Sequence, residues 1–202
     1  SLGTVLLPRA AYYIEHQQMD EFKKLSRKAL NFVFIIASPM MIYFILFAKQ
    51  GIFFLSGDAF APAVVPMQLI MPTLLLIGIT NILGIQILVP LGYEKAVLVS
   101  EIVGAVIDLV VNALLIPVYQ SSGAAIGTLL AEFAVMVVQC IALKNEIKTA
   151  FSDIKYLKII LAIILASLAS FWVTALNLHV FITLVISAIL FFGVYGLVLI
   201  IM

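Results

Sequence analysis

Six long apolar runs restrict what this chain can fold into more than any other feature. Each contains about twenty residues, the length at which an α-helix, rising about 1.5 Å per residue, crosses the roughly 30 Å hydrocarbon core of a bilayer. Of the 202 residues, 65% are hydrophobic and 10% are charged, whereas soluble domains carry about a quarter charged residues. We therefore expect an all-α integral membrane protein, a helical bundle with spans over 29–48, 67–89, 96–117, 124–143, 159–178 and 180–202.

The stretches between these runs divide the chain into three parts. Residues 1–28 begin with the apolar end of a transmembrane helix whose first half we expect upstream, and continue over 9–28 as a polar, amphipathic helix on the cytoplasmic membrane surface. Residues 29–143 contain four spans. Residues 144–202 contain a basic cytoplasmic loop and two final spans.

Local signals add detail to this outline. Pro39 and Pro72 lie inside expected spans, where we expect them to bend the helices. The longest connector between spans, 49–66, contains Gly57 and two prolines, so we expect a loop there. Small residues at four-residue spacing predict that one span packs closely against a neighbour; they are Gly123, Gly127 and Ala131.

The basic residues are divided unevenly between the two ends of the expected helices. If successive spans alternate in direction, ten of the eleven basic residues fall on one side of the membrane and only Lys49 falls on the other. The ten are Arg9, Lys23, Lys24, Arg27, Lys28, Lys95, Lys144, Lys148, Lys155 and Lys158. Because cytoplasmic loops are rich in Lys and Arg, we expect this side, and the C-terminus with it, to be cytoplasmic.

Carboxylates inside the spans are the sharpest candidates for function. Glu101, Asp108 and Asn112 are seven and four residues apart, so a helix places them on one face. A charge within the membrane is costly, which makes each of these residues a functional hypothesis. The next span adds Glu132, and three acids on two successive helices favour a shared polar cavity.

The chemistry of this acidic face has two interpretations. Asp108 is suited to bind and release a proton, or to bind a sodium ion with Asn112 as a second oxygen donor. Alternatively, a protonated Asp108 forms a structural hydrogen bond with a neighbouring helix, and Glu101 reaches the lipid headgroups.

Other polar residues give weaker signals. Gln86 and Asn81 are candidate cavity residues, although neutral amides in spans often serve only as hydrogen-bond partners between helices. Cys140 is the only cysteine, which excludes an internal disulfide. The sequence offers no nucleophile with a base and no cluster of metal ligands, so we expect no enzyme activity and no cofactor.

Several stretches, taken in order, match a family pattern. They are LGTVLLPRAAYYI, FFLSGDAFAPAV, GIQILVPLGYEK, IDLVVNALLIPVY and GAAIGTLLAE. Together they resemble the Wzx-type oligosaccharide flippases, the polysaccharide-biosynthesis branch of the superfamily that includes the MATE exporters. The resemblance covers residues 2 to about 143. It departs from the family at Asp108, where an asparagine is common, and this difference adds a candidate proton or cation site.

The resemblance implies a fold, a substrate and a location. The chain would be the C-terminal lobe of a MATE-like two-lobed transporter, with the missing N-terminal lobe of the same chain as its partner. Such transporters carry an undecaprenyl-pyrophosphate-linked oligosaccharide across the bacterial cytoplasmic membrane for capsule or lipopolysaccharide synthesis, by alternating access driven by a proton or sodium gradient. Membrane lipids are further expected partners, and nucleic acid is not.

Two other functions remain open from the sequence. A pyrophosphate needs Arg or Lys, and as possible contacts the chain offers only Arg9 and Lys95, near the cytoplasmic face; central cations would come from the missing lobe. Acids without cations would suit a MATE-type exporter of organic cations. In a third interpretation, the chain is a noncatalytic membrane scaffold whose acids are only structural.

Overall fold

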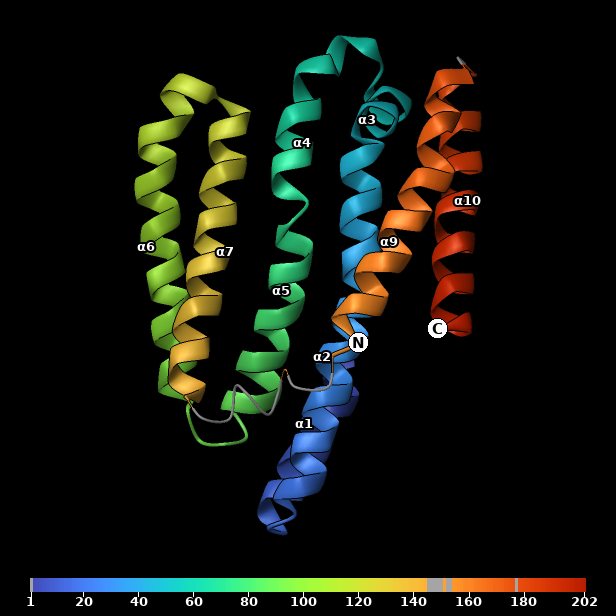
Figure 1. Ribbon diagram of the computed structural model, residues 1–202. Helices are drawn as coiled ribbons and strands as arrows, with labels where there is room; N and C mark the ends of the chain where they lie inside the picture. Colours follow the sequence, from blue (N-terminus) through green and yellow to red (C-terminus); the bar gives the residue numbers. More distant parts are fainter. Residues whose placement is uncertain (1, 145–150, 152–153, 177) are drawn as a thin grey trace.

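The computed structural model describes residues 2–144, 151, 154–176 and 178–202 as a bundle of long helices (Figure 1). These ranges contain no β-strand, and six of their helical segments are long and apolar enough to cross a membrane. The six are Met19–Leu46, Asp58–Leu88, Glu94–Tyr119, Ser121–Leu143, Tyr156–Leu176 and Val180–Ile201. Each overlaps one expected span, so the prediction of an all-α membrane bundle is confirmed.

The spans run up and down in alternation and form two hairpins at the edges of the bundle (Figure 1). One hairpin consists of α6 (Glu94–Tyr119) and α7 (Ser121–Leu143), and the other of α9 (Tyr156–Phe171, continued by η3, Trp172–Leu176) and α10 (Val180–Ile201). Between them lie α2 (Met19–Leu46) and the pair α4 (Val64–Ile70) and α5 (Thr73–Asn81). Helix α7 packs on α4 and α5, while α2 contacts α5, α9 and α10.

The polar segment near the N-terminus differs from the expected surface helix over 9–28. Helix α1 (Leu2–Glu15) continues past Arg9, the chain turns at Gln17 in the left-handed region with φ of 57°, and α2 begins at Met19. The polar residues are thus shared between the end of one helix and the beginning of a span. Asp20 and Glu21 in the first turn of α2 favour this start, because acidic side chains stabilise a helix N-terminus.

Helix α2 is longer than a membrane requires. Its 28 residues extend over about 42 Å, against a hydrocarbon core of about 30 Å. Its first turns therefore stand outside the hydrocarbon, where they pair with α1 in a helical hairpin that projects beyond the other helices (Figure 1).

The second span is built from several short helices. The prediction of a loop over 49–66, before and at the beginning of this span, is wrong. That stretch forms α3 (Ala48–Ser56) and η1 (Asp58–Ala63), joined at Gly57, whose φ of 81° suits a residue without a Cβ. Pro72 separates α4 from α5, as expected of a proline that interrupts a helix, whereas α2 continues through Pro39. The span ends in a π-helical segment, η2 (Ile82–Leu88).

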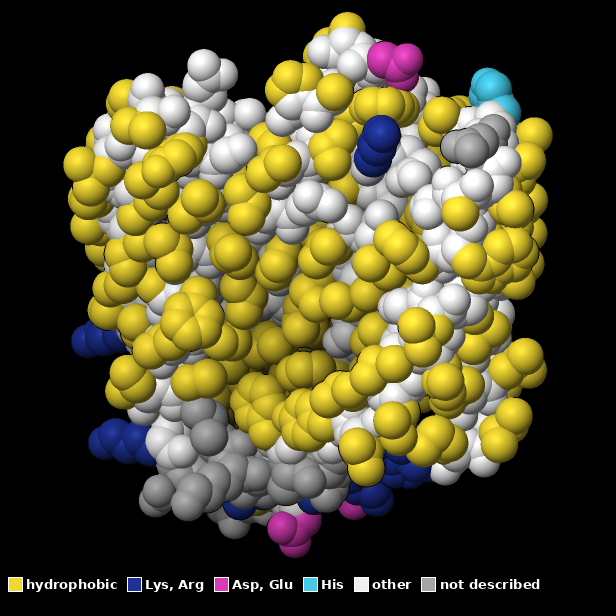
Figure 2. Space-filling model, turned by 45° about the horizontal axis from the view of Figure 1, so that its top comes forward, with side chains coloured by type: hydrophobic (Ala, Val, Ile, Leu, Met, Phe, Trp, Pro, Cys, Tyr) yellow, Lys and Arg dark blue, Asp and Glu magenta, His cyan; other side chains and the backbone are white. Residues whose placement is uncertain are grey.

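The basic residues described by the structure gather at one end of the bundle. Lys95 lies in the first turn of α6, Lys144 is the residue after the last turn of α7, and Lys155 is the residue before the first turn of α9. Because successive helices alternate in direction, these three helix ends lie on the same side of the bundle. Lys148 lies outside the described residues. Figure 2 shows a broad apolar belt on one face with most of the visible Lys and Arg side chains at its lower margin. This arrangement agrees with a membrane-embedded, multi-pass protein.

Two apolar clusters hold the described helices together. One joins α1, α2, η2 and α7 near the basic end and includes Leu30, Leu83 and Leu88, each fully buried. The other joins α2, α9 and α10 around Phe47 and Phe191. Close packing of α7 on α6 is confirmed at the small residues: a Cβ on Gly123 would lie 2.5 Å from the carbonyl oxygen of Leu115.

Candidate functional site

Helix α6 positions an acid and an amide on one face, as their spacing predicts. The Asn112 amide Nδ2 donates a hydrogen bond of 3.0 Å to Asp108 Oδ2. The other side-chain oxygens, Asp108 Oδ1 and Asn112 Oδ1, are buried and have no hydrogen-bond partner within the described ranges. The pair thus leaves one carboxylate oxygen and one amide oxygen without a hydrogen bond among the described residues, and of the two residues Asp108 lines a cavity.

A cavity of about 250 Å³ opens beside this pair, between α6 and α7. Glu101 and Asp108 line it from α6, and Glu132 and Thr128 line it from α7. Gly104 and Ala131 also form part of its wall, and their small side chains leave room between the helices. The three acids on two helices thus share one cavity, as the sequence predicts.

A second cavity, of about 220 Å³, adjoins the first because Glu101 and Glu132 line both. Asn81 and Thr80 line it from α5, and Gln139 lines it from α7. Neither cavity has a lysine or arginine among the described residues of its lining. The two together form an acidic pair of cavities along α6 and α7, with hydroxyl and amide groups at their edges.

Gln139 lines the second cavity but is not among the residues that the sequence analysis selected, because it lies toward the end of a span. It is seven residues after Glu132, the same spacing that joins Glu101 to Asp108, and this periodicity was a usable signal. Its amide Nε2 donates to Ser100 Oγ at 3.3 Å, and its Oε1 is buried without a hydrogen-bond partner among the described residues.

The other predicted site residues do not join the acids. Gln86 is only 3% exposed and lies in η2, outside the described linings of both acidic cavities. Arg9 and Lys95 are exposed, on α1 and at the beginning of α6, and line neither cavity. In the ranges described, no group of three His, Cys, Asp or Glu side chains is arranged to hold a metal ion.

The acidic cavities are suited to protons and cations. Carboxylate and amide oxygens are ligands for hard cations, and a carboxylate in a dry site can also take a proton. Glu101 is exposed in the described structure, and its charge would be costly against lipid tails. We therefore expect this face of α6 and α7 to contact water or further protein, and not lipid tails.

Comparison with known proteins adds a membrane relative. The chain is 25% identical over 195 residues to an uncharacterized membrane protein of Methanocaldococcus jannaschii, a match that covers 96% of this chain and 38% of the relative. The chain thus spans about two fifths of the length of that relative. No family model matches the chain, and no solved structure matches it.

Proposed function

We propose that this chain is part of an ion-coupled transporter that flips a lipid-linked oligosaccharide across the cytoplasmic membrane by alternating access. The fold would be the C-terminal lobe of a MATE-like transporter, facing a second lobe. The family resemblance of the sequence motifs supports the substrate class. The longer membrane relative is compatible with a chain that functions together with further helices.

The observation that carries the coupling role is the convergence of three carboxylates on adjoining cavities. Glu101 and Glu132 line both cavities, and Asp108 lines one of them beside the amide of Asn112. Intramembrane acids that share a cavity are a recurring feature of proton and ion pathways. In the proposed cycle, binding of a proton or sodium ion neutralises the Asp108 carboxylate and favours one orientation of the lobes.

A second candidate, export of an organic cation, is favoured by the composition of the same cavities. Their described linings hold carboxylates and no lysine or arginine, a lining that attracts a cation more readily than a pyrophosphate. The flippase would need cationic groups from elsewhere in the complete protein. The two candidates differ in substrate and share the acidic site.

The test measures transport by the complete protein in proteoliposomes. The substrate is a fluorescent oligosaccharide linked to a short polyprenyl pyrophosphate, and a proton or a sodium gradient is applied in turn. We expect gradient-driven flipping by the wild type and a loss of at least about tenfold in Asp108→Asn, which keeps the side-chain shape and removes the charge. Asp58→Asn, an identical change at an exposed residue of η1, is the matched control and should transport normally.

Each contrary result points to a different conclusion. If Asp108→Asn flips the substrate at the wild-type rate under both gradients, Asp108 has no role in coupling transport to the ion gradient. Efflux of ethidium by the wild type, without flipping of the lipid-linked sugar, would favour the cation exporter. Movement of neither substrate would favour the scaffold.

A further inference from the structure

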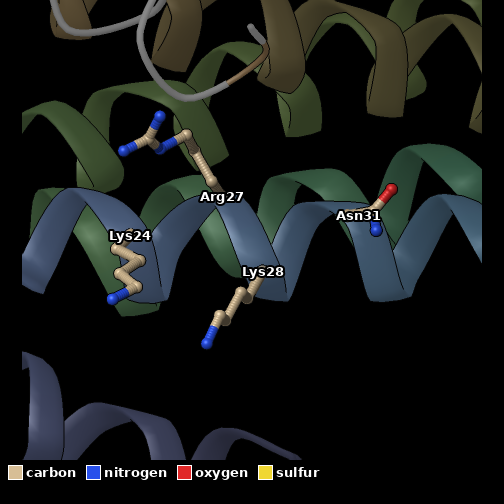
Figure 3. A pocket seen from close by; sticks show the side chains of 4 residues that line it. All are labelled: Lys24, Arg27, Lys28 and Asn31. Carbon is tan, nitrogen blue, oxygen red and sulfur yellow. The ribbon is translucent and has the colours of Figure 1, made fainter. Parts of the chain in front are cut away.

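A third cavity, of about 310 Å³, lies at the basic end of α2 and has the opposite charge (Figure 3). Its described lining consists of Lys24, Arg27, Lys28 and Asn31. All four lie within eight residues of α2, so they come from consecutive turns of one helix. The proposed transport cycle uses none of these residues.

The charges around this cavity favour an anion. Three cations line it, and no acid is among its described lining residues. Glu21 reaches Lys24 at 3.6 Å, but both side chains are more than half exposed, so this ion pair is weak. The Nε of Arg27 donates to the carbonyl oxygen of Lys23 at 3.4 Å, which orients the guanidinium along the helix. In Figure 3, Lys24 and Lys28 extend side by side from one edge of α2, whereas Arg27 extends from the opposite edge.

The cavity lies at the depth of lipid headgroups. Because the 28 residues of α2 are about 12 Å longer than the hydrocarbon core is thick, its first two turns, to about Ser26, stand outside, and Lys24 and Lys28 lie on either side of the point where the helix enters the membrane. This is the side on which the basic residues gather, and the cytoplasmic leaflet carries the anionic lipids.

The helix surface next to the cations distinguishes a lipid from a free anion. Lys24, Lys28, Phe32 and Ile36 follow one another at four-residue spacing on one stripe of α2. Phe32 is 49% exposed and Ile36 is 45% exposed. Two cations followed by two exposed apolar side chains match the order of groups in a phospholipid, whose phosphate is followed by acyl chains. A free phosphate ion has no apolar group that could contact Phe32 and Ile36.

We propose that this cavity binds the headgroup of an anionic phospholipid from the cytoplasmic leaflet. The ammonium groups of Lys24 and Lys28, which extend side by side, neutralise the phosphate, while Arg27 and Asn31 line the other side of the cavity. The acyl chains lie along Phe32 and Ile36. The site is independent of the proposed transport function, and it holds a lipid whatever substrate the protein moves.

The test measures lipid selectivity directly. The complete protein is reconstituted in phosphatidylcholine vesicles with a trace of acyl-chain spin-labelled phosphatidylglycerol or phosphatidylcholine, and the motionally restricted fraction is read by electron paramagnetic resonance. We expect the wild type to prefer phosphatidylglycerol. In the triple variant Lys24→Gln/Arg27→Gln/Lys28→Gln, the ratio of phosphatidylglycerol binding to phosphatidylcholine binding should fall at least about tenfold, since each basic residue near a membrane surface strengthens the binding of anionic lipid.

Three further variants isolate the cavity. Lys144→Gln/Lys155→Gln/Lys158→Gln removes as many cations at the same end of the bundle but outside the described lining, and should change the preference less than twofold. Lys28→Gln changes one exposed side chain, so folding is preserved, and should weaken the preference about fivefold. Phe32→Ser/Ile36→Ser should weaken retention of phosphatidylglycerol while leaving the binding of inorganic phosphate unchanged.

The contrary outcomes overturn the proposal in different ways. Equal losses in the two triple variants would assign the preference to general surface charge. Unchanged preference in both Lys28→Gln and the cavity triple variant would exclude the cavity. Complete displacement of the lipid by millimolar inorganic phosphate, with no effect of Phe32→Ser/Ile36→Ser, would make free phosphate the ligand.

Discussion

Gly127 of α7 lies directly against the side-chain oxygen of Asn112 on α6, at the point where Asn112 holds Asp108. A Cβ on residue 127 would overlap Asn112 Oδ1 and would lie 3.4 Å from Asp108 Oδ1. The close approach of the two helices and the geometry of the candidate ion site therefore both depend on the absence of a side chain at residue 127.

Gly127→Ala should destabilise the protein and disturb the acidic site together. The added methyl group must displace the Asn112 amide, and overpacking of this kind costs about 1–3 kcal/mol. Thermal unfolding of the complete protein in detergent measures the loss, and flipping in proteoliposomes should fall with it. Gly196→Ala is the matched control: it lies in the span α10, where an added Cβ meets nothing within 4 Å. Equal unfolding temperatures for Gly127→Ala and the wild type would show that the contact yields without cost.

A second glycine, Gly84 in η2, fixes the position of Gln139. A Cβ there would lie 2.9 Å from Gln139 Nε2, the atom that donates to Ser100 Oγ. Gly84→Ala should therefore push the amide away from its acceptor and cost about 1–2 kcal/mol. Gln139→Ala creates the space that the methyl group needs, so the double variant should be at least about 1 kcal/mol more stable than the sum of the two single changes predicts. A double-mutant cycle of unfolding free energies measures this coupling, and strict additivity would contradict the contact.

The six spans were predictable because apolar length is a local property of the sequence. A run such as 180–202 needs no knowledge of its neighbours to be recognised as a span, and α10 covers nearly the same residues. The α1–α2 hairpin was not predictable in this way. Residues 9–28 are amphipathic, and only the packing of α1 on α2 and η2 shows that they complete two helices instead of lying on the membrane surface.

The acidic site was predictable in part, for the same reason. Helical spacing alone placed Glu101 and Asp108 on one face. The contributions of Asn81 and Gln139 depend on how α5 and α7 pack against α6, which spacing within one helix does not determine. Lys24 and Lys28 were interpreted only as markers of topology, since nothing in their local pattern indicates a cavity beside them.

Two tyrosines tie α10 to α2, each bonding to the backbone of the other helix. The hydroxyl of Tyr195 donates to the carbonyl oxygen of Ile35 at 2.8 Å, and that of Tyr43 donates to the carbonyl oxygen of Leu184 at 2.9 Å. Tyr195→Phe keeps the ring and should lower stability by about 0.6 kcal/mol, the average for hydrogen bonds between membrane helices. Tyr119→Phe, at an exposed residue, should leave the unfolding temperature unchanged. A shift as large in Tyr119→Phe as in Tyr195→Phe would mean that the interhelical bond contributes nothing specific.

The orientation of the bundle can be tested with single cysteines, because Cys140, the only cysteine of these 202 residues, can be replaced. In a Cys140→Ser background, one variant each carries Lys49→Cys, Lys95→Cys or Lys155→Cys, all at exposed residues. The enrichment of basic residues on the side of Lys95 and Lys155 predicts that these two face the cytoplasm. A membrane-impermeant maleimide should therefore label Lys49→Cys in intact cells and the other two only after the membrane is permeabilised. The reverse pattern would invert the topology and would place the basic cavity of α2, with Lys24 and Lys28, on the outer leaflet.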